Sequence, residues 1–528
     1  MNARYDIAVV GSGFAGSLLA MIARRLGHSV VLIEKGTHPR VVIGESSTPL
    51  ANLLFEELCV RYDLPELRPL TKWGSWQRAH PEVACGLKRG FTFHHHPLDG
   101  THSFGAGHGD QLLVAASPHD EIADMHWYRA DFDYFLVREA EKLGVNYFDR
   151  VALNGFDDDG REIQLHGERG GQEIAIRAQF IVDATGPRGF LHRALRLSES
   201  ALLDYPATQS LYSHFTGVGR LEQTEFSRLD AEPPYPIDDA AVHHVFDGGW
   251  IWVLKFNNGM TSAGIAATDE LAARLRLTDG APAWDRLLNL IPALKAQFAD
   301  AHAVRPFTHM PRLAFRSAEI AGDRWALLPS AAGFVDPLLS TGFPLTLLGV
   351  ARIAEIIARH WGSNDLAAQL KGYAAKTGQE LLATAQLIGA LYANMNRFDM
   401  FVALTQLYFA AASFAESARR LEKPQLAQSF LLCTHPAFGP ACAEICARAK
   451  QQLSTAELNA LIGRIYATIE PINVAGLGNS ERRNWYPVEA EDLLNSAAKL
   501  GASRADVEAL LKRCGFICET VPDQIATS

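Results

Sequence analysis

Three glycines near the N-terminus are the residues whose type and spacing point most directly to chemistry. Gly11, Gly13 and Gly16 form a GxGxxG pattern between an apolar run at 5–10 and a run of helical periodicity. Gly11 permits a tight turn, Gly13 lets backbone approach a pyrophosphate, and Gly16 lets helix and strand pack closely. The free N–H groups at the helix start face the phosphates. Glu34 ends the next apolar run, where a carboxylate can accept hydrogen bonds from ribose hydroxyls. The pattern predicts dinucleotide contacts at Gly11, Ser12, Gly13, Ala15, Gly16 and Glu34.

Two segments far downstream favour FAD over a nicotinamide cofactor. FIVDATG at 180–186 and LLPSAAGFVDP at 327–337 are not needed by a continuous nicotinamide-binding domain. They resemble the two later motifs of FAD-dependent hydroxylases and their relatives, in which a strand end and a helix start bring backbone to the flavin. Those relatives usually carry Gly-Asp before the glycine turn. Here the pair is Pro329-Ser330, so Ser330 is expected to supply one hydrogen bond to FAD.

Four motifs taken together resemble the flavin-dependent halogenases. The longer stretches around them are most similar to the phenol-type branch, which includes phloroglucinol halogenases, and the resemblance runs from residue 5 to about 350. The motifs, in chain order, are GESSTP at 44–49, KRGFTF at 88–93, GWIW at 249–252 and DPLLSTG at 336–342.

The resemblance implies a reaction that uses two sites. Reduced FAD, oxygen and chloride or bromide yield hypohalous acid beside the flavin, and a lysine at the far end of a tunnel delivers electrophilic halogen to an aromatic ring. Lys88 matches that lysine. A flexible amine in a poorly solvated pocket has a lowered pKa and changes protonation readily, which arginine cannot do. The alternative for Lys88 is a surface lysine at a strand end.

The same resemblance assigns roles to several other positions. Thr341 and Gly342 match a halide site, where backbone N–H groups at a helix start hold an anion; the alternative is an ordinary helix cap. Trp250 and Trp252 match a pair that keeps substrate away from the flavin; the alternative is core packing. The implied cofactor contacts outside the glycine motif are Glu45, Ser46, Arg129, Ser330 and Asp336.

One departure bears on the substrate. Tryptophan halogenases carry a glutamate before the serine that corresponds to Ser340, and this glutamate assists the lysine. Here that residue is Leu339. The change favours a small, electron-rich phenolic substrate, because a ring activated by its own oxygen needs less help.

The predicted fold class is α/β, with an FAD-binding Rossmann-like domain similar to that of p-hydroxybenzoate hydroxylase. Residues 1–360 are expected to form this module, with an antiparallel substrate sheet interleaved at about 60–105 and 200–305, where strand patterns alternate. Residues 361–528 are mostly of helical pattern and are expected to cover the substrate pocket. A helix is predicted at 131–143, with Asp131 as its N-cap.

Composition and charge limit the partners and the location that we expect for the chain. The chain has 528 residues and a net charge of −10, which gives no global reason to expect nucleic acid or an anionic membrane as a partner. No signal peptide and no long uninterrupted apolar stretch is visible, so we expect a cytoplasmic enzyme that does not interact with membranes. Its 7 cysteines form no CxxC pair, and we expect reduced thiols and no metal site.

The sequence leaves three functions open. A halogenase needs reduced FAD from a separate flavin reductase, because no second nucleotide-binding motif is visible. The first alternative is a single-component aromatic hydroxylase, whose FAD is reduced directly by NADPH. The second is a flavoprotein without halogenase activity; Pro329-Ser330, and Leu254-Lys255 in place of the family's Ile-Pro, motivate it.

Overall fold

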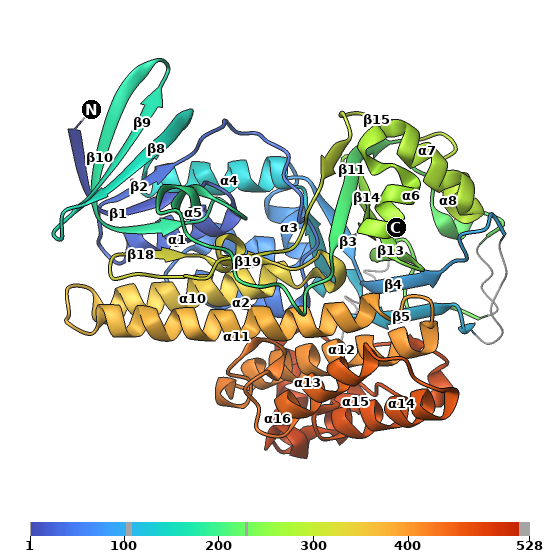
Figure 1. Cartoon of the computed structure of the whole chain (residues 1–528). Coiled ribbons are helices and arrows are strands. Elements are labelled where there is room, and N and C mark those ends of the chain that lie inside the picture. Colours follow the sequence, from blue (N-terminus) through green and yellow to red (C-terminus); the bar gives the residue numbers. More distant parts are fainter. Residues whose placement is uncertain (1, 102–107, 227–230, 517–528) are drawn as a thin grey trace, which may run out of the picture.

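The computed structural model describes residues 2–101, 108–226 and 231–516 (Figure 1). Its first sheet holds the predicted dinucleotide module. The central strand β1 pairs in parallel with β2 on one side and β10 on the other, and every residue of Ile7 to Val10 is buried. The strands of this sheet are β1 (Asn2–Val10), β2 (Val30–Ile33), β7 (Asn146–Phe148), β8 (Val151–Asp158), β9 (Ile163–Arg169), β10 (Gln172–Asp183) and β18 (Trp325–Leu327).

Helices flank this sheet where the sequence turns from strand to helix. Helix α1 (Phe14–Arg25) follows β1 directly and packs on α4 (Arg129–Lys142), so the predicted β-α-β unit is confirmed. The start of α4 differs from the prediction. Tyr128 is the N-cap, and the Asp131 carboxylate accepts the Ala84 N–H at 3.2 Å. Asp131 is therefore a residue of the first turn that binds a neighbouring segment.

The second sheet carries the predicted substrate region. Its core is antiparallel, but β12 and β4 pair in parallel, as do β5 and β20. Strands β5, β16 and β20 lie outside the predicted segments at about 60–105 and 200–305. The two residues of β20 are too few to show alternation. The strands are β4 (Gly90–His95), β5 (Gln111–Ala115), β11 (Thr208–Thr216), β12 (Ala241–Phe246), β13 (Gly249–Lys255), β14 (Thr261–Thr268), β15 (His302–Ala303), β16 (Thr308–Met310) and β20 (Trp485–Tyr486).

A two-stranded ribbon stands beside both sheets. Strand β3 (Cys85–Lys88) pairs with β6 (Asp124–Trp127) in antiparallel register, which places Lys88 directly opposite Asp124. Strand β3 runs almost directly into β4, and β6 leads through Tyr128 into α4. The ribbon thus connects the second sheet with α4.

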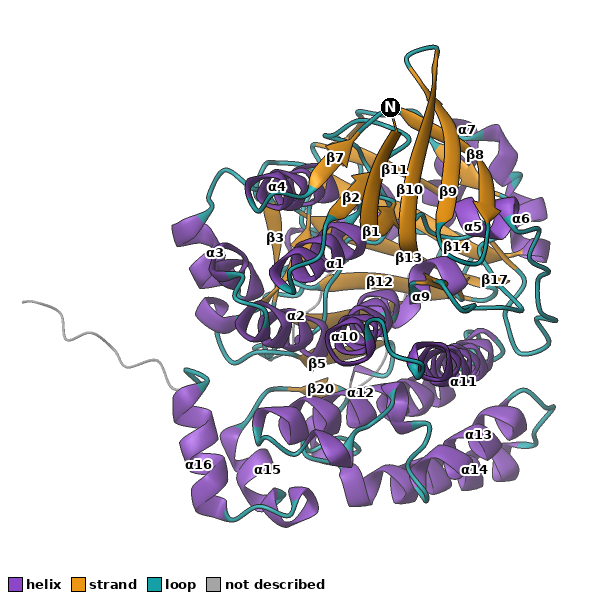
Figure 2. Cartoon of the chain, turned by 90° about the vertical axis from the view of Figure 1, so that its left-hand side faces the viewer, coloured by secondary structure: helices purple, strands orange, loops and turns teal. Residues whose placement is uncertain are grey.

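Long helices build the C-terminal part of the chain. Figures 1 and 2 show α10 and α11 between the two sheets and the helices α12 to α16. The segments Leu338–His360 and Phe398–Arg420 have the length and apolar character of membrane spans, but 72% and 83% of their most apolar windows are buried, as in core helices. The helices are α10 (Gly342–His360), α11 (Leu366–Tyr392), α12 (Phe398–Arg420), α13 (Phe438–Ala449), α14 (Thr455–Ile469), α15 (Ala490–Asn495) and α16 (Arg504–Arg513).

Candidate active site

Two cavities are lined by residues of the four family motifs. We call the first, of about 330 Å³, the cofactor cavity; segments 13–15, 42–46, 184–187 and 333–337 line it, together with side chains from β13 and the start of α10. We call the second, of about 220 Å³, the tail pocket; it lies between α2 (Pro49–Arg61), strands β4 and β5, and the helical tail. The volume of the cofactor cavity lies in the range of ligand-binding sites.

The predicted glycine turn forms one end of the cofactor cavity. Gly11 has a φ of +100°, which only glycine adopts readily, and a Cβ on it would press on the backbone of Ala184. A Cβ on Gly16 would collide with the Gly11 carbonyl oxygen. Gly13 is the N-cap residue of α1 and lines the cavity with Ala15, so unpaired N–H groups of the first helical turn face it. This end is therefore built to receive a phosphate-bearing ligand.

Glu34 lies behind this turn and is not among the residues that line the cavity. Its carboxylate accepts the Ser12 N–H at 3.1 Å, the Ser12 hydroxyl at 2.9 Å and the Gly36 N–H at 2.9 Å. Burial acts to raise the pKa of Glu34, but Arg40 and these donors outweigh it and lower the pKa. In the structure, Glu34 fixes the turn, and its contact with ribose remains a prediction.

Arg129 contributes its guanidinium to the cavity from the start of α4. It forms two hydrogen bonds of 2.8 Å with the buried Asp133 and donates to the Gly44 carbonyl at 2.9 Å. Its guanidinium carbon lies 5.1 Å from the centre of the Phe14 ring. These contacts fix a cationic group at the wall where the family motif at 44–49 begins.

The motif residues Glu45 and Ser46 line the same cavity. The Glu45 carboxylate and the His214 ring of β11 are 2.9 Å apart, and both side chains are buried. Sequence reasoning missed His214, because nothing in the sequence of β11 marks this residue. Its pairing holds the carboxylate at the junction of the cofactor cavity and the second sheet.

The predicted halide residues also line the cofactor cavity. Two non-glycine residues just before α10, Leu339 and Ser340, have φ values of 65° and 54°, a conformation that costs free energy. Thr341 and Gly342 follow and line the cavity, and space beside Gly342 is open. A bent backbone that leads into a helix start presents N–H groups to an anion. The Thr341 side chain makes no capping hydrogen bond, which weakens the helix-cap alternative.

Trp250 and Trp252 form a wall of the cofactor cavity. Their ring centres are 5.7 Å apart, and the Trp252 indole N–H donates to Ser262 at 3.3 Å. The Trp250 indole donates to the Asp336 carboxylate at 3.2 Å, which also accepts the Tyr392 hydroxyl at 2.9 Å. Burial raises the pKa of Asp336 to about 6. The two tryptophans are buried in the core and also line the cavity. Core packing is therefore compatible with the predicted role of keeping substrate away from the flavin.

Lys88 lies between the two cavities and is fully buried. Its ammonium group donates to the Ser46 hydroxyl at 2.9 Å and to the Ser47 carbonyl, and lies 3.7 Å from the centre of the Phe91 ring. Ser46 lines the cofactor cavity and Phe91 lines the tail pocket. Burial lowers the pKa of Lys88, against the opposing effect of Asp124. The surface-lysine alternative is therefore wrong.

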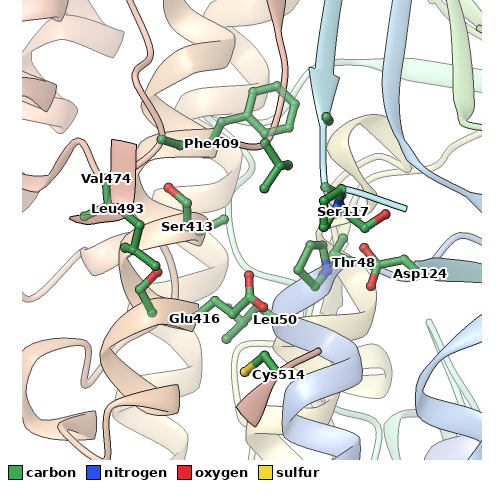
Figure 3. Close-up of a pocket in the computed structure, with 18 of the residues that line it drawn as sticks. Thr48, Leu50, Ser117, Asp124, Phe409, Ser413, Glu416, Val474, Leu493 and Cys514 are labelled. Carbon is green, nitrogen blue, oxygen red and sulfur yellow. The ribbon is translucent and has the colours of Figure 1, made fainter. Parts of the chain in front are cut away.

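The tail pocket is aromatic and acidic. Figure 3 shows Phe409, Ser413 and Glu416 of α12 on one wall and Thr48 and Asp124 across from them. None of these residues was predicted to form a site. Thr48 belongs to the motif at 44–49 but was assigned no role, and no motif marks the residues of α12. No sequence signal marks Asp124, because only the register of β3 with β6 places it opposite Lys88.

The residues present fit FAD. The glycine turn leaves room for backbone contact, Ser330 and Asp336 line the far half of the cavity, and Arg129 adds a positive charge. Within the described residues, no group of three or more His, Cys, Asp or Glu side chains is arranged to hold a metal ion. The arrangement can therefore bind a dinucleotide in one cavity and a second, smaller molecule in the other.

Comparisons with known proteins agree with this geometry. Residues 123–402 match the tryptophan halogenase family model, and residues 9–48 match an NAD(P)-binding Rossmann-like domain. Monodechloroaminopyrrolnitrin halogenase PrnC of Pseudomonas fluorescens is 28% identical over 76% of this chain and 70% of its own length. Tetracycline 7-halogenase of Kitasatospora aureofaciens is 27% identical over 77% of this chain and 73% of its own length.

The fold is also that of a solved halogenase. The crystal structure of halogenase PltM in complex with phloroglucinol and FAD superimposes with a TM-score of 0.79. It covers 91% of this chain and 99% of the PltM chain, at 23% sequence identity. The match extends beyond the Rossmann-like module into the helical tail, where sequence motifs gave no guidance.

Proposed function

The chain belongs to the tryptophan halogenase family and is a flavin-dependent halogenase that binds FAD, and on that premise we propose that it halogenates an electron-rich, phenolic ring. The observation that carries the proposal is Lys88: a fully buried amine whose contacts line the cofactor cavity on one side and the tail pocket on the other. A lysine without solvent contact, placed between two cavities, suits the transfer of a reactive species from one to the other.

The cofactor cavity would hold FAD by its own backbone and side chains. The N–H groups at the start of α1 would bind the pyrophosphate, and Arg129 and Ser330 would contact the rest of the cofactor. Reduced FAD, with oxygen, supplies the oxidising power that converts halide to hypohalous acid. Because we see no second nucleotide site in the sequence, a separate reductase would deliver the reduced flavin.

The halide would bind at the start of α10. Gly342 leaves open space there, and the N–H groups of the first helical turn have no partner within the helix. Chloride and bromide both fit the chemistry of such donors. The neighbouring Trp250 and Trp252 would separate the aromatic substrate from the flavin and so favour halogenation over direct hydroxylation.

Lys88 would bind hypohalous acid and direct its halogen into the tail pocket. A protonated amine donates a hydrogen bond to the oxygen of hypohalous acid and makes that oxygen a better leaving group. Ser46 and the Ser47 carbonyl orient the ammonium group, and the low solvation keeps its proton exchangeable. An arginine here would not change its protonation and would lack this ability.

The tail pocket suits an aromatic substrate. Phe91, Tyr408 and Phe409 offer ring faces, and apolar residues of the tail complete the walls. Leu339 stands in place of an assisting glutamate, so a ring activated by its own hydroxyl is the better substrate. The reported complex of PltM with phloroglucinol supports this substrate class. We further propose that the enzyme works in the cytoplasm.

The test is a reaction of the purified protein with FAD, a flavin reductase, NADH, oxygen and bromide, offered a panel of phenols and resorcinols. The expected product, read by mass spectrometry, has bromine in place of hydrogen. A product that gains one oxygen atom would instead support an aromatic hydroxylase. Peroxide without any converted substrate would support a flavoprotein without halogenase activity.

A further inference from the structure

Asp124 is a buried carboxylate that the family motifs do not include. It stands opposite Lys88 in the β3–β6 register, and side chains of such a pair share one face of the ribbon with Cβ atoms about 5 Å apart. Asp124 is 6% exposed and lines the tail pocket beside Thr48 (Figure 3). The carboxylate thus lies on the substrate side of the lysine.

The two oxygens of Asp124 differ in their surroundings. Oδ1 accepts the Asn52 amide at 2.6 Å, and the same amide donates to the Ser47 hydroxyl at 3.1 Å. The Ser47 carbonyl in turn accepts from Lys88. Oδ2 is buried and has no hydrogen-bond partner among the described residues. A buried acceptor without a partner costs free energy, which a ligand donor would recover.

The other acidic groups of the tail pocket are differently placed. The Glu416 carboxylate accepts the Arg420 guanidinium at 2.8 Å and is thereby neutralised. His126 and His243 also face Lys88, and burial lowers the pKa of each to about 3, so both are neutral. The titratable groups that act on the charges of the pair or share the tail pocket with it include Glu56 of α2, Lys72, His126 of β6, His243 of β12, Tyr408, Glu416 and Arg420 of α12, Tyr486 of β20, Glu489, Asp492 of α15 and Cys514.

We propose that Asp124 is the catalytic base of the tail pocket and accepts the proton that the aromatic ring loses when it takes up halogen. The inference rests on the proposed function. It assigns to β6 a carboxylate opposite the lysine, in a chain that carries Leu339, just before α10, where tryptophan halogenases carry a glutamate. Asn52 is the positioning residue that orients it.

The proposed step balances in atoms and protons. The ring carbon–halogen bond forms as the halogen–oxygen bond of hypohalous acid breaks, and the leaving hydroxide takes a proton from the Lys88 ammonium to become water. The ring C–H bond then breaks, its electron pair restores aromaticity, and Asp124 takes the proton. Asp124 finally returns this proton to the neutral Lys88 amine, so that both groups are restored.

The protonation of the pair supports this cycle. Burial raises the pKa of Asp124 against the effect of Lys88, and burial lowers the pKa of Lys88 against the effect of Asp124. Their proton affinities therefore approach each other, and the return of the proton costs little. Since the base must be ionised and the ammonium protonated, the rate should rise and then fall across the neutral range.

The test compares wild type with Asp124→Asn, Asp124→Glu and the control Asp131→Asn, which retains an oxygen acceptor for the Ala84 N–H. Each FAD-loaded protein receives a flavin reductase, NADH, oxygen, bromide and resorcinol with hydrogen or deuterium on its ring carbons. A second measurement is the NMR titration of Lys88 in protein made with ¹³C-labelled lysine, with the signal assigned by its loss in Lys88→Met.

We expect Asp124→Asn to brominate about 100-fold more slowly, with unchanged FAD binding and no acidic limb in its pH profile. Its deuterium isotope effect should become clearly primary, because C–H cleavage becomes slow, and Asp124→Glu should recover part of the rate. The Lys88 pKa should fall further, since the carboxylate that raises it is lost.

Three outcomes that contradict the proposals can be told apart. If wild type brominates but Asp124→Asn matches it in rate and isotope effect, the proposed base is wrong. If Lys88 has the same pKa in wild type and in Asp124→Asn, Lys88 and Asp124 do not affect each other's protonation and the proposed cycle is wrong. If wild type brominates neither resorcinol nor any other phenol of the panel, the proposed function is overturned, and the titration still decides whether Asp124 controls Lys88.

Discussion

The cofactor cavity and the tail pocket are built in different ways. The cofactor cavity depends on backbone: a glycine turn at Gly11 and Gly13, a helix start at Gly342, and residues 184–187 at the end of β10. The tail pocket depends on side chains such as Phe91, Asp124 and Glu416, which come from separate elements of the chain. A cavity built from backbone requires glycines at fixed spacing in the sequence. A cavity built from side chains is assembled by the fold from residues that have no fixed spacing.

This difference predicts that substitutions in the two cavities will have separable effects. Damage to the cofactor cavity should remove FAD and therefore all activity. Damage to the tail pocket should leave the flavin bound and reducible but slow the formation of halogenated product. Lys88 contacts residues of both cavities. Its substitution should leave FAD affinity unchanged, as substitutions in the tail pocket do, and should also leave substrate affinity unchanged.

The largest effect on FAD is expected for Gly16→Val. Its side chain would collide with the Gly11 carbonyl oxygen, which cannot move without distorting the phosphate-binding turn. We expect FAD affinity to fall by about 100-fold or more, as for a clash that costs about 3 kcal/mol. Flavin fluorescence titration measures this.

The matched control for Gly16→Val is Gly463→Ala. Gly463 is an exposed glycine of α14, and a Cβ on it would meet no atom within 4 Å. This variant should bind FAD as wild type does and be slightly more stable, because alanine favours helix. Normal FAD affinity in Gly16→Val would show that the close approach of α1 to β1 is not needed.

A smaller and more selective effect is expected for Ala412→Trp. Ala412 lines the tail pocket from α12, and an indole there would fill space that the substrate needs. We expect kcat/KM for the phenol to fall about tenfold or more, equivalent to about 1.4 kcal/mol, with FAD binding unchanged. Steady-state kinetics with parallel flavin titration measures both, and an unchanged kcat/KM would place the substrate elsewhere.

The smallest effect is expected for Tyr392→Phe, which removes one of the donors to the Asp336 carboxylate. The free energy of unfolding should fall by about 1–2 kcal/mol, since the hydrogen bond is buried and its acceptor is a carboxylate. Urea denaturation measures this. Tyr134→Phe, at a half-exposed tyrosine, should leave stability unchanged, and equal losses in both would argue against a specific role for the Asp336 contacts.

The fold of the first 360 residues was largely predictable because strand periodicity and glycine spacing are local properties. The unit of β1, α1 and β2 follows from apolar runs and their breaks. The N-cap of α4 was not predicted correctly. Asp131 has the chemistry of a cap, but its carboxylate bonds to Ala84, a residue distant in sequence, so local preference did not decide.

Site residues could be proposed from the sequence only where a motif specifies them. Family motifs predicted roles for Lys88, Trp250 and Thr341, and these roles remain predictions; in the structure Trp250 and Thr341 line the cofactor cavity and Lys88 is fully buried. His214 and Asp124 were missed, because each is defined by a partner on another strand. Cross-strand register is set by the whole sheet and is not visible in either strand alone.

The central claim is that Lys88 connects the cofactor cavity with the tail pocket. Lys88→Met tests it most directly, since methionine fills a similar volume without the amine; Lys371→Met, at an exposed lysine of α11, is the control. We predict that Lys88→Met binds FAD like wild type and yields no brominated phenol in the reductase-coupled reaction. Full bromination by this variant would contradict the claim.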